Sequence, residues 1–277
     1  MPFTIFDPNM NKIDYPVSVL PLDFLVSAIE KERYVENVNG IPGNINYGFD
    51  YKDREVSLNF WLRHFHGEHD QKLLKSELYA MLDSQPYFYV SDDKLPTRVL
   101  KLAVDEPYLP DRINGSNIST LEFKCQIIGL PFWQTKYTTQ EIEISGYSAI
   151  EGKYGLADGI NVDYPNYTFD TKVVYVWNGG NVTIDPRNMP LSIKVNNINS
   201  NGNFTIVNDT TGEQFIYKKP IGATVLNLKG TKVLISTYNY LRDTNRKFIS
   251  LKPGLNKLRF LNGEFENVKI DFPFYYK

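Results

Sequence analysis

The sequence is poor in the residues that close disulfides and carry nucleophilic chemistry. Its 277 residues include one cysteine, Cys125, and three histidines. A single cysteine excludes an intramolecular disulfide framework. Cys125 alternates with Leu121, Phe123 and Ile127, which is the period-two pattern of one strand face. We therefore interpret Cys125 as a small buried hydrophobic residue, since no partnered base lies near it in the sequence.

Long apolar runs are missing as well. No stretch approaches the roughly 20 apolar residues that span a bilayer. Residues 1–7 show no basic segment followed by an apolar one, so we expect no signal peptide. We therefore expect the chain to fold in a cytoplasm.

Common catalytic motifs are also missing. The sequence contains no G-x-S-x-G, no P-loop, no G-x-G-x-x-G, no H-E-x-x-H and no cysteine–histidine cluster. We predict that the protein is not an enzyme and has no cofactor. A hydrolase that uses loop carboxylates such as Asp92-Asp93 or Asp105-Glu106 is an open alternative. Exposed loop acids are the simpler interpretation of these pairs.

A change in composition divides the chain at residues 129–134, which read GLPFWQ. Residues 1–134 carry a net charge of −6, whereas residues 135–277 carry +4. The length is compatible with two domains that each bury a core. We predict one domain at residues 1–134 and a second at residues 135–277.

The first part predicts an α+β domain. Residues 22–51 indicate a strand, a loop tip at residues 39–44 and a return strand. Residues 54–63 alternate between apolar and polar side chains, as a half-buried strand does. Residues 68–82 place leucines on one helical stripe that Pro86 ends. A sheet with a single main helix accounts for this order.

The second part predicts an all-β sandwich without a convincing helix. Short apolar stretches recur there between turns rich in Asn, Asp and Gly. The 19 Tyr and 17 Phe of the chain suit β-structure. We predict strands at residues 141–145, 172–177, 191–195, 204–207, 214–217, 224–228, 232–236, 258–261 and 267–271.

All three histidines lie close together, at His64, His66 and His69. The first two can share a strand face, so the group is a candidate zinc site. The alternative is a strand-to-helix corner, in which Gly67 makes the bend and acidic residues favour the positive end of the helix. His64 also continues the inward face of the preceding strand, so it is a candidate buried structural residue. We favour the structural interpretation and predict no metal.

In the second part, we expect five aromatic side chains to be exposed, namely those of Tyr164, Tyr167, Trp177, Tyr238 and Tyr240. Aromatic rings on a β-sandwich can stack on sugar rings. We take Tyr164, Trp177 and Tyr238 as candidate glycan-stacking residues. The simpler interpretation is that such rings fill the core or subunit contacts.

Several segments follow one another in an order that is informative only as a whole. In the first part they are residues 54–60 (REVSLNF), the helix at 71–82, the aromatic strand after it, and residues 123–126 (FKCQ) with 130–133 (LPFW). In the second part they are residues 208–212 (NDTTG), 251–256 (LKPGLN) and 270–274 (IDFPF). This order resembles the distal tail (Dit) proteins of siphophages that infect Gram-positive bacteria, over nearly the whole chain.

The resemblance implies a non-enzymatic structural protein of the virion tail tip or baseplate, assembled in the bacterial host cytoplasm. The first domain would be a ring-forming belt domain that closes a homo-hexamer, and the second a galectin-like sandwich that projects outward. The implied partners are the tail tube protein, a tail-tip or tail-associated lysin protein, and a receptor-binding protein that serves host attachment. DNA would pass through the lumen of the ring without specific binding. The family carries no catalytic residues.

The residues of the first domain also indicate where subunit contacts lie. We predict interface residues at the loop tip, namely Asn39, Ile41 and Asn44, and at Trp61, which alternation turns away from the apolar strand face. The acidic charge of this domain suggests that acidic residues line the lumen and repel DNA phosphates. A stand-alone carbohydrate-binding adhesion protein is the alternative function.

Overall fold

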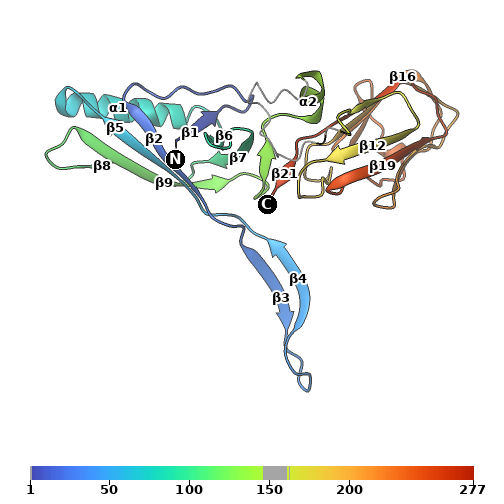
Figure 1. Cartoon of the computed structure of the whole chain (residues 1–277), viewed down its shortest axis with the longest axis horizontal. Coiled ribbons are helices and arrows are strands. Elements are labelled where there is room, and N and C mark those ends of the chain that lie inside the picture. Colours follow the sequence, from blue (N-terminus) through green and yellow to red (C-terminus); the bar gives the residue numbers. More distant parts are fainter. Residues whose placement is uncertain (1, 146–160, 162) are drawn as a thin grey trace. The chain divides into compact units, whose positions relative to one another are not determined.

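The computed structural model describes residues 2–145, 161 and 163–277. The chain divides into two compact units, Met1–Trp133 and Gln134–Lys277 (Figure 1). The predicted boundary follows residue 134, one residue beyond this division. The roles assigned to the two domains stay predictions.

The first unit is built on one antiparallel sheet. Its strand order is β1-β6-β7-β9-β5-β2, and β8 pairs with β9. Strand β5 is an internal strand, because Val56 lies opposite both Val26 of β2 and Cys125 of β9. The strands are β1 (Phe3–Phe6), β2 (Val19–Val26), β5 (Val56–Arg63), β6 (Phe88–Asp92), β7 (Arg98–Ala103), β8 (Asp111–Arg112) and β9 (Ile118–Ile127).

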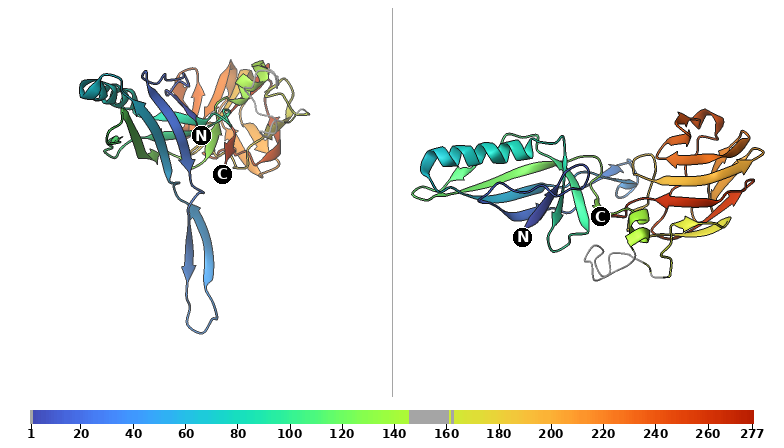
Figure 2. Two further views of the ribbon diagram at one scale, coloured as in Figure 1. Left: turned by 60° about the vertical axis from the view of Figure 1, so that its left-hand side comes forward. Right: turned by 90° about the horizontal axis from the view of Figure 1, so that it is seen from above.

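The helix α1 (Gly67–Leu82) lies along one face of this sheet (Figure 2). Gly67 makes the bend with φ +78°, a conformation that a residue with a Cβ rarely adopts. The Asp70 carboxylate accepts hydrogen bonds from the Phe65 and His66 backbone N–H groups, at 2.6 and 3.2 Å. These bonds tie the helix start to the chain that enters it. The predicted helix and its corner are therefore observed.

The core of the first unit lies between α1 and the sheet. Leu74, Leu78 and Leu82 of the helix are buried against the inward face of β5 and β9. Phe60 is fully buried and stacks on Phe123, with ring centroids 5.9 Å apart. Burial of each such side chain contributes about 1.5–3 kcal/mol. The alternation seen in the sequence identifies the face of β5 that is buried.

A separate hairpin continues from the strands β2 and β5. It consists of β3 (Lys31–Glu36) and β4 (Ile45–Tyr51), and Figure 1 shows it extending beyond the sheet. Every residue of β3 is exposed. The connecting turn contains the predicted loop tip, and Gly40 and Gly43 adopt positive φ there. The hairpin therefore stands without a core of its own.

The second unit contains two antiparallel sheets, ordered β11-β20-β13-β16-β17-β18 and β12-β19-β14-β15. Each sheet buries one face, the arrangement of a β-sandwich; the likeness to galectin stays a prediction. The strands are β11 (Thr168–Phe169), β12 (Val173–Asn178), β13 (Ser192–Ser200), β14 (Phe204–Asn208), β15 (Glu213–Tyr217), β16 (Ile221–Lys229), β17 (Lys232–Ile235), β18 (Tyr238–Asn239), β19 (Gly254–Leu261) and β20 (Asn267–Asp271), and β10 (Trp133–Thr135) pairs with β21 (Tyr275–Tyr276).

One predicted strand of the second part is wrong. Residues 141–145 belong to the helix α2 (Thr139–Ser145), so this part does contain a helix besides the short 3₁₀ turn η2 (Leu241–Asp243). The Glu141 carboxylate accepts a hydrogen bond from the Thr138 N–H at 2.8 Å, which is one half of a capping box. Ile142 is buried whereas Ile144 is 83% exposed, although a strand would place both on one face.

Candidate interaction surfaces

A row of exposed leucines lies on strand β2. Leu20 is 49% exposed, Leu22 40% and Leu25 52%. Leu20 is the direct register partner of Trp61, so the two share the sheet face that points away from buried Phe60. We call Leu20, Leu22, Leu25 and Trp61 the leucine face. Exposed apolar side chains gathered in this way mark an interaction site.

The backbone of β2 is exposed in the same region. This strand is the last in the sheet order, so its outer edge has no strand partner among the described residues. A register shift between Pro21 and Asp23 leaves Leu22 as an extra, outward residue of a bulge. An open edge with apolar neighbours favours pairing with another chain unless something covers it.

The hairpin presents a second apolar surface. Two tyrosines lie on it with carboxylate partners across the strands: the Tyr34 hydroxyl donates to Asp50 and the Tyr47 hydroxyl to Glu36, both at 2.9 Å. These carboxylates raise the pKa of both phenols, so the tyrosines stay protonated donors at neutral pH. The exposed apolar residues of the hairpin are Tyr34, Val35, Val38, Ile41, Tyr47 and Phe49.

The four predicted interface residues fall on these two surfaces. Asn39, Ile41 and Asn44 lie in the exposed turn of the hairpin, and Trp61 lies on the leucine face. Their role in subunit contacts stays a proposal. The leucines of β2 could not be identified from the sequence, because the bulge interrupts the alternation that would have marked them.

The three histidines are placed at the corner before α1. His64 is buried, and its backbone N–H donates to the Asn117 carbonyl at 3.0 Å. His66 is the residue before the helix, and His69 lies in its first turn. Within the described part of the chain, no group of three or more His, Cys, Asp or Glu residues could hold a metal ion. The geometry supports the structural interpretation of His64.

Burial accounts for Cys125, and local hydrogen bonds account for Asp92 and Asp93. Burial raises the pKa of the Cys125 thiol to about 12, so the thiol stays protonated at neutral pH. The Asp92 carboxylate accepts from the Lys94 N–H, and the Asp93 carboxylate from the Thr4 hydroxyl, both at 2.8 Å. These acids therefore stabilise local turns and strand ends.

Two of the three candidate glycan-stacking residues lie at strand β12, and the third lies on the other sheet. Trp177 lies on β12, and Tyr164 lies beside Tyr175 of that strand, with ring centroids 6.3 Å apart. Tyr238 is 70% exposed but lies on β18 of the other sheet. Tyr167, which the sequence indicated as exposed, is fully buried. A sugar-binding role of the three candidates stays a prediction.

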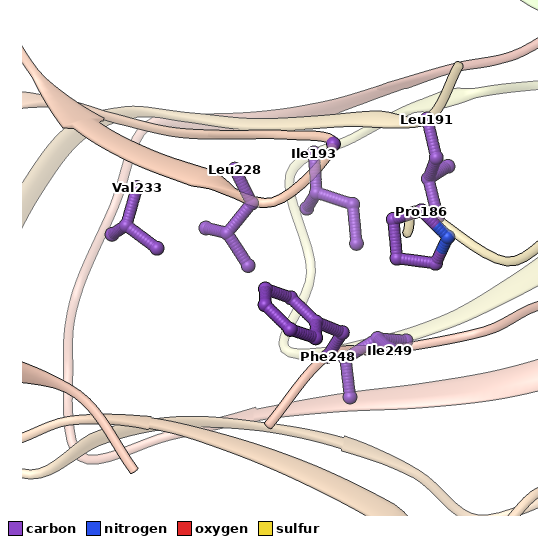
Figure 3. Close-up of a pocket in the computed structure, with 8 residues that line it drawn as sticks. Pro186, Leu191, Ile193, Leu228, Val233, Phe248 and Ile249 are labelled. Carbon is purple, nitrogen blue, oxygen red and sulfur yellow. The ribbon is translucent and has the colours of Figure 1, made fainter. Parts of the chain in front are cut away.

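Two cavities neighbour each other in the second unit. The first is apolar and holds about 10 Å³, room for about one water (Figure 3). The second is an open polar cleft of about 460 Å³. Pro186 and Phe248 belong to both linings. The cleft alone is large enough to admit a small ligand.

Comparisons with known proteins extend these observations. Residues 14–125 match the family described as the phage tail protein RIFT-related domain, whereas no curated protein matches the chain. The crystal structure of the Dit protein of phage SPP1, described as a paradigm of the hub adsorption apparatus in phages infecting Gram-positive bacteria, has a TM-score of 0.69. It is 14% identical, and the match covers 99% of each chain.

Two structures of the phage p2 baseplate in its activated conformation are more distant. The one with Sr has a TM-score of 0.48 at 10% identity, covering 98% of this chain and 97% of that chain. The one with Ca has a TM-score of 0.47 at 11% identity, covering 100% of this chain and 98% of that chain.

No helix among the described residues is long and apolar enough to cross a membrane.

Proposed function

We propose that this protein is the structural hub of a tail tip. The premise is that residues 14–125 form a phage tail protein domain and that the chain has the fold of a siphophage distal tail protein. The family match and the match to the structure of SPP1 Dit confirm the resemblance found in the sequence. The observation that carries the proposal is the likeness to SPP1 Dit, which extends over 99% of both chains. Proteins that share a fold can have different functions. The exposed surfaces of the chain therefore decide how it assembles.

The first unit closes a homo-hexameric ring in this proposal. The leucine face and the open edge of β2 lie together on one side of the sheet. A six-membered ring with cyclic symmetry is built from heterologous contacts, so this surface would meet a different surface of the next subunit. Heterologous contacts generate a closed ring when the rotation between subunits closes.

The hairpin supplies a second contact in the proposed ring. Its strands expose apolar residues on an arm that has no core of its own. A neighbouring subunit that covers Tyr34, Val35 and Ile41 would remove this apolar surface from water. Each square ångström of apolar surface removed contributes roughly 25 cal/mol. We propose Asn39, Ile41 and Asn44 of the turn, together with Trp61, as interface residues.

The second unit would project from the ring and contact other tail proteins. The ring would join the tail tube protein to a tail-tip or lysin protein and leave a channel through which DNA passes. The proposed role requires no catalytic residue. A receptor-binding protein docked on the second unit is the further partner that this role implies.

Changes on the leucine face test the ring. We expect the unchanged chain to have about six times its protomer mass of 32.0 kDa in light scattering and to show six-fold rings in negative-stain images. Leu20→Asp and Leu25→Asp place charges at exposed positions, so the protomer should fold while the assembly is lost.

The matched control is Leu109→Asp, because Leu109 is 67% exposed in the same unit but lies outside the leucine face. This variant should assemble normally. A second variant, Ile41→Asp, tests the turn of the hairpin in the same way. A monomer at micromolar concentration for the unchanged chain, or rings that survive both leucine changes, would contradict the proposal.

A further inference from the structure

The polar cleft of the second unit is built from three separate segments. Its lining comes from residues 185–187, residues 212–214, and residues 246–248 with Ser250. The volume of about 460 Å³ lies within the range of small-molecule sites. Phe248 adds an apolar surface to a lining that is otherwise mostly charged and polar. The cleft is thus concave and chemically mixed, which is typical of ligand sites and not of flat protein contacts.

Asn245 fixes one wall of the cleft onto strand β15. Its backbone N–H donates to the Ile216 carbonyl at 3.0 Å, and its side-chain amide donates to the Gln214 carbonyl at 2.8 Å. The side-chain oxygen in turn accepts from the Ile216 N–H at 3.1 Å. Three hydrogen bonds from one residue hold the adjacent Arg246 and Lys247 beside the cleft. The two cations therefore stand on a fixed support.

The charges in the cleft are not balanced. Arg187 donates from Nε to both oxygens of Asp185, at 2.9 and 3.0 Å, and this pairing lowers the pKa of the Asp185 carboxyl. Arg246 and Lys247, in contrast, form no ion pair within 4.0 Å among the described residues. Two exposed cations are left to face an anionic ligand.

Glu213 also lines the cleft, but it forms no ion pair within 4.0 Å with Arg246 or Lys247 among the described residues. Its Oε2 accepts from the Ser250 N–H at 2.6 Å, from the Ser250 hydroxyl at 2.7 Å and from the Thr211 hydroxyl at 3.0 Å. These bonds join residue 250 of one wall to residue 213 of another. The carboxylate therefore holds the cleft in shape, and its second oxygen is left to accept a hydrogen bond from a ligand.

The backbone at Arg246 is unusual. Its φ is +56°, in the left-handed region that glycine or asparagine fills with less strain. The Arg246 N–H is tied to the Thr244 hydroxyl at 3.0 Å, which helps to hold this conformation. A long cationic side chain at a position suited to glycine points to a role for the guanidinium beyond folding.

We propose that this cleft binds an anionic saccharide, a sugar unit that carries a phosphate or carboxylate group. The anionic group would contact Arg246 and Lys247. The hydroxyl groups would bond to Gln214 and to the second oxygen of Glu213, and the C–H face of the ring would cover Phe248. An acidic surface of another protein is disfavoured, because stable protein contacts need about 800 Å² per partner with matching shape.

Calorimetric titration of the full-length chain tests the proposal with four probes. These are glucose 6-phosphate, glucuronate, neutral glucose and inorganic phosphate. We expect at least one anionic sugar to bind tenfold more tightly than glucose and than inorganic phosphate, and its affinity to fall as salt is raised. Equal binding of glucose, or of phosphate alone, would overturn the proposal. Tighter binding of a poly-glutamate peptide than of either anionic sugar would also overturn it.

Arg246→Gly separates binding from folding. Glycine suits the positive φ, so the melting temperature should stay level or rise, while the affinity for the anionic sugar falls at least tenfold. Lys247→Ala should weaken binding as well. The matched control is Lys218→Ala, which removes an exposed cation of the same unit outside the cleft and should leave the affinity unchanged.

Unchanged affinity in Arg246→Gly would overturn the proposal. The homo-hexameric ring is tested separately by the mass of the assembly. Failure of the saccharide-binding proposal therefore leaves the ring proposal intact, and failure of the ring proposal leaves the saccharide-binding proposal intact.

Discussion

At the scale of single residues, Gly180 shows how closely the second unit is packed. A Cβ at this position would lie 2.3 Å from the Tyr275 carbonyl oxygen and 2.8 Å from its nitrogen, and backbone atoms cannot move aside as a flexible side chain does. We expect Gly180→Ala to destabilise the unit by about 3 kcal/mol. The melting temperature should then fall by roughly 10 °C.

The control for this change is Gly222→Ala, because nothing lies within 4 Å of a Cβ there and φ is not positive. That variant should melt within a few degrees of the unchanged chain. Equal melting temperatures for the two variants would contradict the packing argument. Residues 178–181 read NGGN, which is typical of a turn, but the steric demand at Gly180 comes from Tyr275, which is distant in the chain.

The candidate interface could be predicted only in part from the residues. Strand β5 alternates cleanly, so the outward position of Trp61 followed from the sequence. Leu20 and Leu25 could not be recognised in this way, because exposure depends on what covers a strand and β2 is the last strand of its sheet. The place of Arg246 in the cleft could not be predicted either, because its positive φ has no signal in a sequence.

At the scale of elements, α1 depends on its first turn. The Asp70 carboxylate accepts backbone hydrogen bonds from Phe65 and His66, and these bonds lower its pKa. A lowered pKa means that the stabilisation is present above the unfolded value of about 3.9 and is lost as the pH falls through the folded value. We expect Asp70→Asn to lower the melting temperature near pH 7 and to have progressively less effect below about pH 4.

Glu77→Gln is the control for this element, because Glu77 lies in the same helix and accepts no hydrogen bond that ties the helix start. Its melting temperature should follow the unchanged chain across the same pH range. A constant difference between Asp70→Asn and the unchanged chain, down to pH 2, would show that the carboxylate charge is not involved.

Elements were predictable where the pattern is long enough to show a period. The helix α1 and strands β5 and β9 repeat their pattern over 16, 8 and 10 residues. The strands β11 and β21 have two residues each and pair with distant chain segments, β20 and β10. The alternation of Ile142 with Ile144 favours a strand, whereas the capping pair Thr138 and Glu141 favours the helix α2 that forms.

At the scale of the whole molecule, charge is divided between the two parts of the chain. Residues 1–134 carry −6, and in a hexamer this charge is repeated six times around the proposed channel. We expect the assembled ring to leave duplex DNA unretarded in a mobility-shift gel at 50 mM salt, where attraction between phosphates and a basic protein is strongest. The acidic protein should also elute early from a heparin column.

The second part of the chain, at +4, could retain DNA on its outer surface and mask this behaviour. A double variant with Arg246→Gly and Lys247→Ala removes two of its exposed cations and should leave the mobility of DNA unchanged if the channel repels it. Retention of DNA by both proteins, with an affinity that falls steeply between 50 and 200 mM salt, would instead place basic residues along the path of DNA. The acidic lining would then be wrong, whereas the ring itself would stand on its measured mass.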